Sequence, residues 1–308
     1  MILCCGEALV DMIPEPTVSG QPGFVPHPGG AVFNTAIALG RLGARVGLLT
    51  GLSRDIFGQQ LRGSLVAANV DASLAILSDR PTTLAFVRFC EGRASYSFFD
   101  ENSAGRMLTP ADMPALPDEV SALFLGGISL ACEPGAEAYA ALVERESGRR
   151  AIMLDPNIRP GLVENAARYR ARLARMVGGA DIVKVSDEDL DWIVDTPRSQ
   201  AEKARVLLDM GPSVVIVTRG AAGAAGILPG GTEVHVPARP AHVVDTVGAG
   251  DTFNAGVLAT LSERGQMSRA GLAALAREDL QEAMQFGARV ASVTVSRAGA
   301  NPPWAHEI

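Results

Sequence analysis

The chain has 308 residues and a formal net charge of -7, and 47% of its residues are hydrophobic but only 5% aromatic. A chain of this length buries roughly 75% of its unfolded surface, so its core needs no disulfide or metal. The acidic balance argues against a nucleic-acid partner and against an anionic membrane surface.

The cysteines favour a reducing compartment, because Cys4, Cys5, Cys90 and Cys132 form no CxxC pair. The chain starts with an apolar strand pattern, without the basic region of a signal peptide. No apolar run reaches the ~18 residues of a membrane helix. We therefore expect a cytoplasmic protein with no membrane partner.

Short aliphatic runs alternate with helical patterns along the chain. Strands are predicted at 2–6, 46–50, 122–126, 151–155, 181–185 and 213–218, and helices at 33–43, 55–68, 135–147, 164–177, 199–209, 250–263 and 271–296. This alternation predicts an α/β fold with a doubly wound, mostly parallel sheet flanked by helices. Ligands bind at the carboxyl ends of such strands, and this rule gathers on one edge Asp155, Lys184, Thr218 and residues 245–251.

Two regions break the alternation. Residues 10–28 are rich in proline, and residues 83–99 alternate like a hairpin with its turn at Glu91-Gly92-Arg93. We predict a small β lid formed by about 10–28 and 83–100, inserted into a single domain that spans 1–308. The alternative is an antiparallel extension at the edge of the main sheet.

The most informative run is 245–256, which leads from a short apolar stretch into a helical pattern. The small residues Gly248, Ala249 and Gly250 let the backbone approach a ligand, and a helix N-terminus favours an anion. The same turn carries the carboxylate of Asp251. An anion nest beside a carboxylate suits phosphoryl transfer to an alcohol, with Asp251 taking the hydroxyl proton. The alternative is a glycine-rich turn capped by this aspartate.

Residues 245–256 resemble the second signature of the PfkB family of carbohydrate kinases, which includes ribokinases and fructokinases. Residues 29–36 resemble the family's first signature and lie about two hundred residues upstream. The resemblance implies a ribokinase-like fold with a small β lid over the sugar. It also implies that the γ-phosphoryl group of ATP moves to a sugar hydroxyl, with Mg²⁺ bridging the ATP oxygens.

The resemblance places several residues at the sugar. Asp11 would accept bonds from sugar hydroxyls, while Gly29, Gly30 and Asn34 would lie against the sugar ring. Arg159, in the run Asp-Pro-Asn-Ile-Arg, would face the sugar or the phosphate path. The alternatives are a surface aspartate at position 11, a helix cap at 34 and a solvent-exposed arginine at 159.

The resemblance also implies a nucleotide site, formed by Asn157, Lys184, Ser186, Thr218, Gly220 and Gly223. Asp189 would act on magnesium through water, although residues 186–189 also read as an ordinary capping box. Asp245 and the segment at Gly299-Ala300 resemble a site for a potassium-type cation. No histidine has metal-ligand spacing.

The overall pattern looks most like the bacterial fructokinases, which implies phosphorylation of the 6-hydroxyl of D-fructose. Asp100 would repel an acidic sugar, which leaves 2-keto-3-deoxygluconate kinase as the runner-up. A catalytically silent sugar- or nucleotide-binding protein is the rival from another class, and the intact Asp251 argues against it. A nicotinamide dehydrogenase is disfavoured because no GxGxxG follows the first strand. A homodimer through exposed lid edges is implied by resemblance.

Overall fold

The main sheet forms the centre of the computed structural model, which describes residues 1–90 and 93–308. Its nine strands lie in the order β15-β14-β13-β12-β11-β10-β1-β4-β6. In chain order these strands are β1 (Ile2–Cys5), β4 (Val46–Leu49), β6 (Val70–Asp71), β10 (Ala122–Gly126), β11 (Ala151–Asp155), β12 (Ile182–Ser186), β13 (Val214–Thr218), β14 (Ala224–Ile227) and β15 (Glu233–Val236). All pairs are parallel except β13–β14 and β14–β15.

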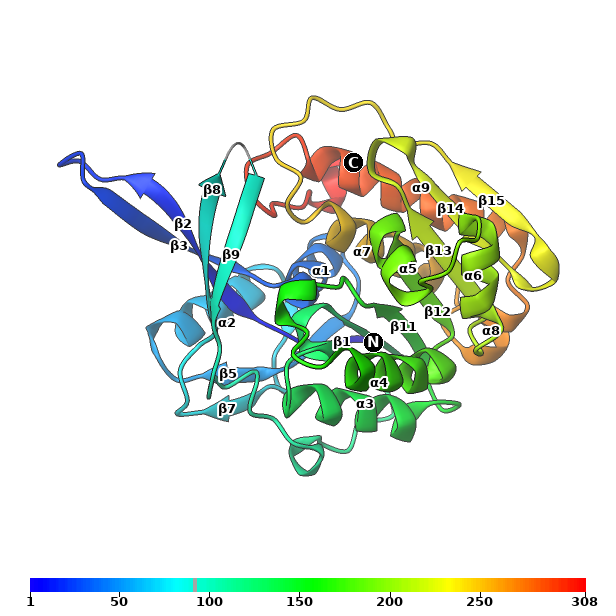
Figure 1. Cartoon of the computed structure of the whole chain (residues 1–308), viewed down its shortest axis with the longest axis horizontal. Coiled ribbons are helices and arrows are strands. Elements are labelled where there is room, and N and C mark those ends of the chain that lie inside the picture. Colours follow the sequence, from blue (N-terminus) through cyan, green and yellow to red (C-terminus); the bar gives the residue numbers. More distant parts are fainter. Residues whose placement is uncertain (91–92) are drawn as a thin grey trace.

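Helices cover both faces of this sheet, and each face has its own apolar core (Figure 1). One layer contains α1 (Ala31–Arg41), α2 (Ile56–Ala67), α7 (Ala249–Glu263), α8 (Arg269–Ala273) and α9 (Arg277–Thr294). The other contains α3 (Gly135–Glu146), α4 (Ala166–Gly179), α5 (Asp187–Ile193) and α6 (Gln200–Leu208). The predicted doubly wound fold is therefore confirmed. The central strands β1, β10 and β11 are nearly continuous apolar runs, as expected for strands buried on both faces.

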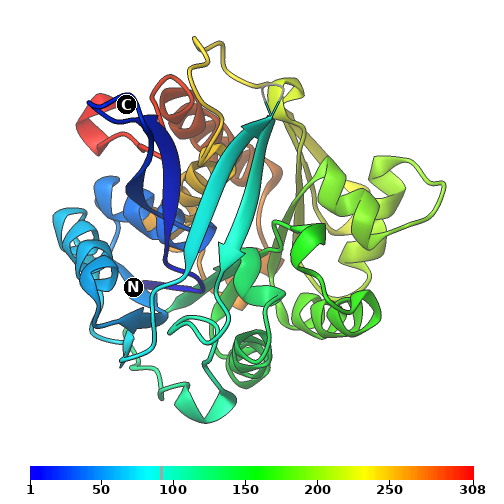
Figure 2. The same ribbon diagram turned by 60° about the vertical axis from the view of Figure 1, so that its left-hand side comes forward.

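A second, smaller sheet stands apart from the first. It contains β2 (Leu9–Pro16), β3 (Pro22–Gly29), β8 (Leu84–Cys90) and β9 (Arg93–Phe99), in the order β3-β2-β8-β9. Figure 1 shows β2 and β3 projecting from the body, and Figure 2 shows β8 and β9 standing across the front of the molecule. The two segments predicted to form a lid thus pair with each other and do not extend the main sheet. Part of the predicted turn, residues 91–92, lies outside the described residues.

Some elements differ from the prediction. The single helix predicted at 271–296 is wrong, because an extended residue, Ala276, separates α8 from α9. Leu272 and Leu275, near this break, are buried, and such packing is invisible to helical periodicity. The sequence also missed β14 and β15, since glycines at 220–226 read as a turn. A short parallel pair, β5 (Gly51–Ser53) and β7 (Ile76–Ser78), was missed too. Nowhere in residues 1–90 or 93–308 does a helix combine the length and apolarity needed to span a membrane.

Candidate active site

A polar cleft of about 320 Å³ opens at the carboxyl edge of the main sheet. The starts of α1 and α7 form its floor, and Tyr96 and Phe98 on β9 of the small sheet reach into it. It brings together residues that lie far apart in sequence: Asp11, Gly30, Asn34, Asn157, Arg159, Lys184, Gly248, Ala249, Gly250 and Asp251. The parallel topology explains this convergence, because strand ends and helix starts share one edge.

The N-terminus of α7 leaves backbone donors free. Gly248 is its N-cap in a left-handed conformation, with φ 79°, and no side chain caps the helix. Among the described residues, the N–H groups of Gly248, Gly250 and Asp251 find no acceptor, whereas that of Ala249 donates to the Thr246 carbonyl at 3.3 Å. Free donors are therefore present where the nest is predicted, but they include Asp251 in place of Ala249. Free donors at a helix start favour an anion.

Asp251 lies in the first turn of α7, with its side chain buried and 7% of the residue exposed. Its Oδ2 accepts a hydrogen bond from Asn34 Nδ2 at 2.9 Å. Burial raises the pKa of Asp251 to about 7, although the bond from Asn34 opposes the rise. A carboxylate with such a pKa accepts a proton readily near neutral pH. The structure thus couples Asn34, predicted at the sugar, directly to the predicted base.

Asp155, Lys184 and Asn254 form a buried polar network near Asp251. Asp155 Oδ2 accepts bonds from Lys184 Nζ at 2.8 Å and from Asn254 Nδ2 at 2.7 Å. Burial disfavours the ammonium of Lys184, but Asp155 outweighs it, and the pKa of Lys184 is raised. Asp155 Oδ1 and Asn254 Oδ1 are buried without a partner among the described residues. Oxygen atoms of this kind suit water or the hydration shell of a hard cation.

Asp11 faces the cleft from β2, at the root of the small sheet. Burial raises the pKa of Asp11 to about 6. Gly29 does not line the cleft, but it leaves room for this carboxylate, since a Cβ at position 29 would lie 2.2 Å from Asp11 Oδ2. Arg159 lines the cleft and donates to Asn157 Oδ1 at 2.7 Å. Carboxylate, amide and guanidinium groups on a small cleft suit a polyhydroxylated ligand.

A second cleft of about 570 Å³ adjoins the first along Thr246, Ala249 and Gly250. The predicted nucleotide residues Thr218, Gly220 and Gly223 line it, opposite Ala288, Ala291, Ser292 and Val295 at the end of α9. Its walls are mainly apolar and suit a flat heterocyclic base. Lys184 and Asn157, predicted at the nucleotide, line the first cleft instead.

Ser186, Asp189 and Asp245 line neither cleft. Ser186 and Asp189 form the capping box of α5, and the other carboxylate oxygen of Asp189 accepts from Ile158 N at 2.9 Å. Both oxygens of Asp189 therefore already accept backbone bonds. Asp245 accepts from Val247 N at 3.0 Å and from Gly299 N at 2.9 Å, which joins the two segments predicted to form a cation site.

The specificity argument from Asp100 is wrong. This residue is 5% exposed, and its carboxylate pairs with Arg106 at 3.0 Å. Asp100 does not line the sugar cleft, where the charged side chains facing a ligand include Arg159 and Lys184. The sequence shows only the order of charges along the chain, so it could not reveal that Arg106 neutralises Asp100.

Sequence reasoning missed the role of Glu7. Its carboxylate is buried at the end of β1, where Oε1 accepts from Ala31 N at 3.0 Å and Oε2 accepts from Ser129 N at 3.3 Å and from its hydroxyl. Glu7 thereby holds the start of α1 against residues 127–130. Burial raises the pKa of Glu7. The apolar residues around Glu7 in the sequence were the available signal, because a glutamate within an apolar stretch is seldom buried without partners for its carboxylate.

Comparison with known proteins identifies the family of the chain. A family model described as pfkB family carbohydrate kinase matches residues 1–307. The chain belongs to the pfkB family of carbohydrate kinases. A fructokinase of Rhizobium leguminosarum bv. trifolii is 48% identical over 281 residues, which cover 91% of this chain and 86% of the relative. A fructokinase of Klebsiella pneumoniae is 34% identical, over 92% of this chain and 90% of that protein.

Solved pfkB-like kinases have the same fold. A fructokinase from Xylella fastidiosa with bound ATP superposes with a TM-score of 0.88 and 28% identity, over 97% of this chain and 93% of that chain. A fructokinase double mutant from Vibrio cholerae O395, with fructose, ADP and potassium bound, gives a TM-score of 0.84 and 26% identity over the same shares.

Proposed function

We propose that this chain is an ATP-dependent fructokinase, which transfers the γ-phosphoryl group of ATP to the 6-hydroxyl of D-fructose. The observation that carries the proposal is the position of Asp251, a buried carboxylate at the N-terminus of α7 where a polar and an apolar cleft meet. The polar cleft would hold the sugar and the apolar cleft would hold the adenine base. Relatives named fructokinase support fructose as the acceptor.

In this mechanism Asp251 takes the proton of the sugar hydroxyl as that oxygen attacks the γ-phosphorus. Its raised pKa, about 7 because of burial, suits this step. The free N–H groups of Gly248 and Gly250 would stabilise the charge that develops on the migrating phosphoryl group. Asn34 fixes the carboxylate through its 2.9 Å bond, and Lys184 adds a positive charge close to Gly250, since a Cβ there would lie 3.2 Å from Nζ.

The residues present fit the ions that such a reaction uses. We found no cluster of three His, Cys, Asp or Glu side chains suited to a metal within residues 1–90 and 93–308. Magnesium would therefore be held mainly by ATP oxygens and water, with the free Oδ1 of Asp155 and, more remotely, Asp189 behind that water. It would neutralise phosphate charge. A potassium-type ion is proposed at Asp245 and residues 299–300, which a 2.9 Å bond joins.

The small sheet is proposed to act as a lid, since Tyr96 and Phe98 on β9 already line the sugar cleft. Closure would exclude water and so limit hydrolysis of ATP. Its outer strands and the exposed Phe24 and Phe99 would pair with a second copy, giving the homodimer implied by the resemblance. Sedimentation equilibrium of the purified protein measures this directly, and a monomer at micromolar concentration would contradict it.

The proposed function is tested by ADP release with ATP and magnesium across fructose, ribose, glucose and 2-keto-3-deoxygluconate. We expect a clear preference for fructose, measured as kcat/KM. Preference for the acidic sugar would support the runner-up kinase, which Arg159 and Lys184 in the cleft favour. No turnover with any sugar, despite binding of sugar and ATP, would support a silent binding protein.

A further inference from the structure

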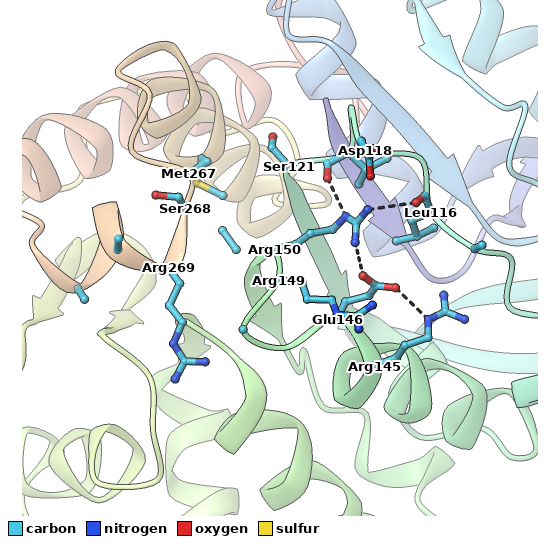
Figure 3. Close-up of a pocket in the computed structure, with 16 residues that line it drawn as sticks. Leu116, Asp118, Ser121, Arg145, Glu146, Arg149, Arg150, Met267, Ser268 and Arg269 are labelled. Carbon is cyan, nitrogen blue, oxygen red and sulfur yellow. Dashed lines mark hydrogen bonds and ion pairs between the residues drawn. The ribbon is translucent and has the colours of Figure 1, made fainter.

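A larger cavity lies at the opposite edge of the main sheet (Figure 3). Its volume is about 980 Å³, against about 320 Å³ for the sugar cleft. Its wall includes Ser121, which precedes β10, and Ala151, the first residue of β11. Asp155, the last residue of β11, belongs to the active-site network. The cavity is therefore at the amino ends of the strands and takes no part in the proposed reaction.

Two of the arginines that line this cavity, Arg145 and Arg150, already have ion-pair and hydrogen-bond partners. Arg145 pairs with Glu146 Oε1 at 2.9 Å, and Arg150 pairs with the other oxygen of Glu146. Arg145 also donates to the carbonyls of Met113 and Pro114, and Arg150 to those of Leu116, Pro117 and Val120. Figure 3 shows Glu146 between the two guanidinium groups. These contacts fix the wall and leave Glu146 neutralised.

Two further arginines line the cavity and are exposed, Arg149 after α3 and Arg269 at the first position of α8. Neither side chain makes a hydrogen bond or ion pair with any other part of the chain that the structure describes. They belong to one surface, because a Cβ at Gly148 would lie 3.5 Å from an Arg269 nitrogen. Arg269 also lies near enough to Asp181 to favour its ionised form, but that carboxylate is engaged by Ile152 N at 2.9 Å.

The charge of the cavity is opposite to that of the whole chain. Four arginines line it against two acids, Asp118 and Glu146, although the chain has a formal net charge of -7. Such a local excess attracts anions. Guanidinium groups bind phosphate oxygens in a fork geometry. Leu116, beside Arg150, and Met267 and Ala273, close in sequence to Arg269, add apolar surface to the lining, which an inorganic ion would leave uncovered.

We propose that this cavity binds a small organic phosphate, with Arg149 and Arg269 holding the phosphate group and the apolar lining residues covering the organic part. The volume is within the range of small-molecule sites, roughly 300–1,000 Å³. The cavity is separate from the sugar cleft, and only the test rests on the proposed function, because ADP and fructose are used there to block the active site.

The test is calorimetric titration with phenyl phosphate, which carries a phosphate group and an apolar ring. The protein holds saturating ADP and fructose, so that the active site is blocked. We expect one saturable site in the native protein, and an affinity at least about tenfold lower in Arg149→Ala/Arg269→Ala. Benzyl alcohol, the neutral counterpart, should not bind measurably.

The matched control is Arg62→Ala/Arg198→Ala, which removes two exposed arginines far from the cavity. This control should keep the native affinity, and both double variants should melt near the native temperature. Equal losses in the two variants would mean general attraction to positive charge and would overturn the proposal. Absence of a saturable site in the native protein, or equal binding of benzyl alcohol, would overturn it as well.

Discussion

Three carboxylates at the active-site edge, those of Glu7, Asp11 and Asp251, have no ion-pair partner among residues 1–90 and 93–308. They differ from the carboxylates between helices α3 and α4, and from Asp155, which pairs with Lys184 at the same edge. Burial raises the pKa of Asp11 to about 6 and that of Asp251 to about 7. Each carboxylate is therefore held in a surrounding that favours its protonated form.

Between the helices, Arg172 is 2% exposed and pairs with Glu133 at 2.7 Å and with Glu137 at 3.0 Å. Burial alone would raise the pKa of Glu137, but its bonds to Arg172 and Arg175 outweigh burial and lower it. The difference teaches that an acid ready for proton transfer combines burial with the lack of a cation partner, whereas Glu137, whose side chain is 33% exposed and paired, belongs to a structural ion pair. Five tests would break or sharpen this contrast.

The largest effect is expected from Asp251→Asn. The amide keeps the size of the side chain but accepts no proton, so kcat for fructose should fall by about a hundredfold or more. Steady-state kinetics measure the loss, and calorimetry should show fructose and ATP still binding. A variant with near-native turnover would remove Asp251 from the role of base.

The next effect concerns stability. Arg172→Met would remove the buried cation that Glu133 and Glu137 share and leave them only the exposed Arg168 and Arg175, so it should lower the free energy of unfolding by about 3 kcal/mol. Urea denaturation measures it. Arg168→Met is the matched control on the same helix, because Arg168 pairs with Glu133 at 3.0 Å but is 60% exposed, and should cost less than about 1 kcal/mol. Equal losses would mean that burial of the ion pair does not matter.

A third effect is the pH dependence of the native enzyme. Because Asp251 must be ionised to accept a proton and its pKa is about 7, kcat/KM should fall about tenfold per pH unit below that value. The residual activity of Asp251→Asn should not show this fall in kcat/KM at acid pH. A native profile that stays flat down to pH 5 would contradict the raised pKa.

The stability of the fold should change with pH in the opposite direction to the activity, because both depend on ionisation of Asp251. A raised pKa means that ionisation opposes folding, so stability present below the ordinary pKa of aspartate, about 4, is lost as pH rises through about 7. Asp251→Asn should therefore gain stability over the native protein at pH 8 but not at pH 4. Melting temperatures at the two pH values check this sign.

The smallest effect is expected from Glu7→Gln. Its carboxylate accepts bonds from both Ala31 and Ser129, whereas an amide can accept on one side only, so the KM for fructose should rise several-fold. Glu7 also raises the pKa of Asp251, and its loss should move the acid limb to lower pH by less than about one unit. Glu15→Gln, on the small sheet, is the control. A higher KM with no shift in the acid side of the pH profile would mean that Glu7 has only a structural role.

Much of the site could be predicted because its motifs lie at the ends of strands and the starts of helices. The alternation of apolar runs and helical patterns placed β10 and β11 at their observed bounds. It also placed residues 245–251 on the same edge as Asp155. Asn34 was predicted at the sugar and Asp251 as the base, but their 2.9 Å bond was not predicted, because a hydrogen bond across 217 residues leaves no local pattern.

By itself, the sequence determined the α/β class and the glycine-rich turn at residues 245–251 that carries the proposed base, because these follow from periodicity and from short-range backbone geometry. Tertiary structure alone decided which charges face one another. It turned Asp100 toward Arg106 and away from the sugar cleft, and it brought Glu7 against Ser129. It also left Arg149 and Arg269 together on one cavity. Pairing depends on distance in space, and a pKa depends on burial and partners, neither of which is written in the order of residues.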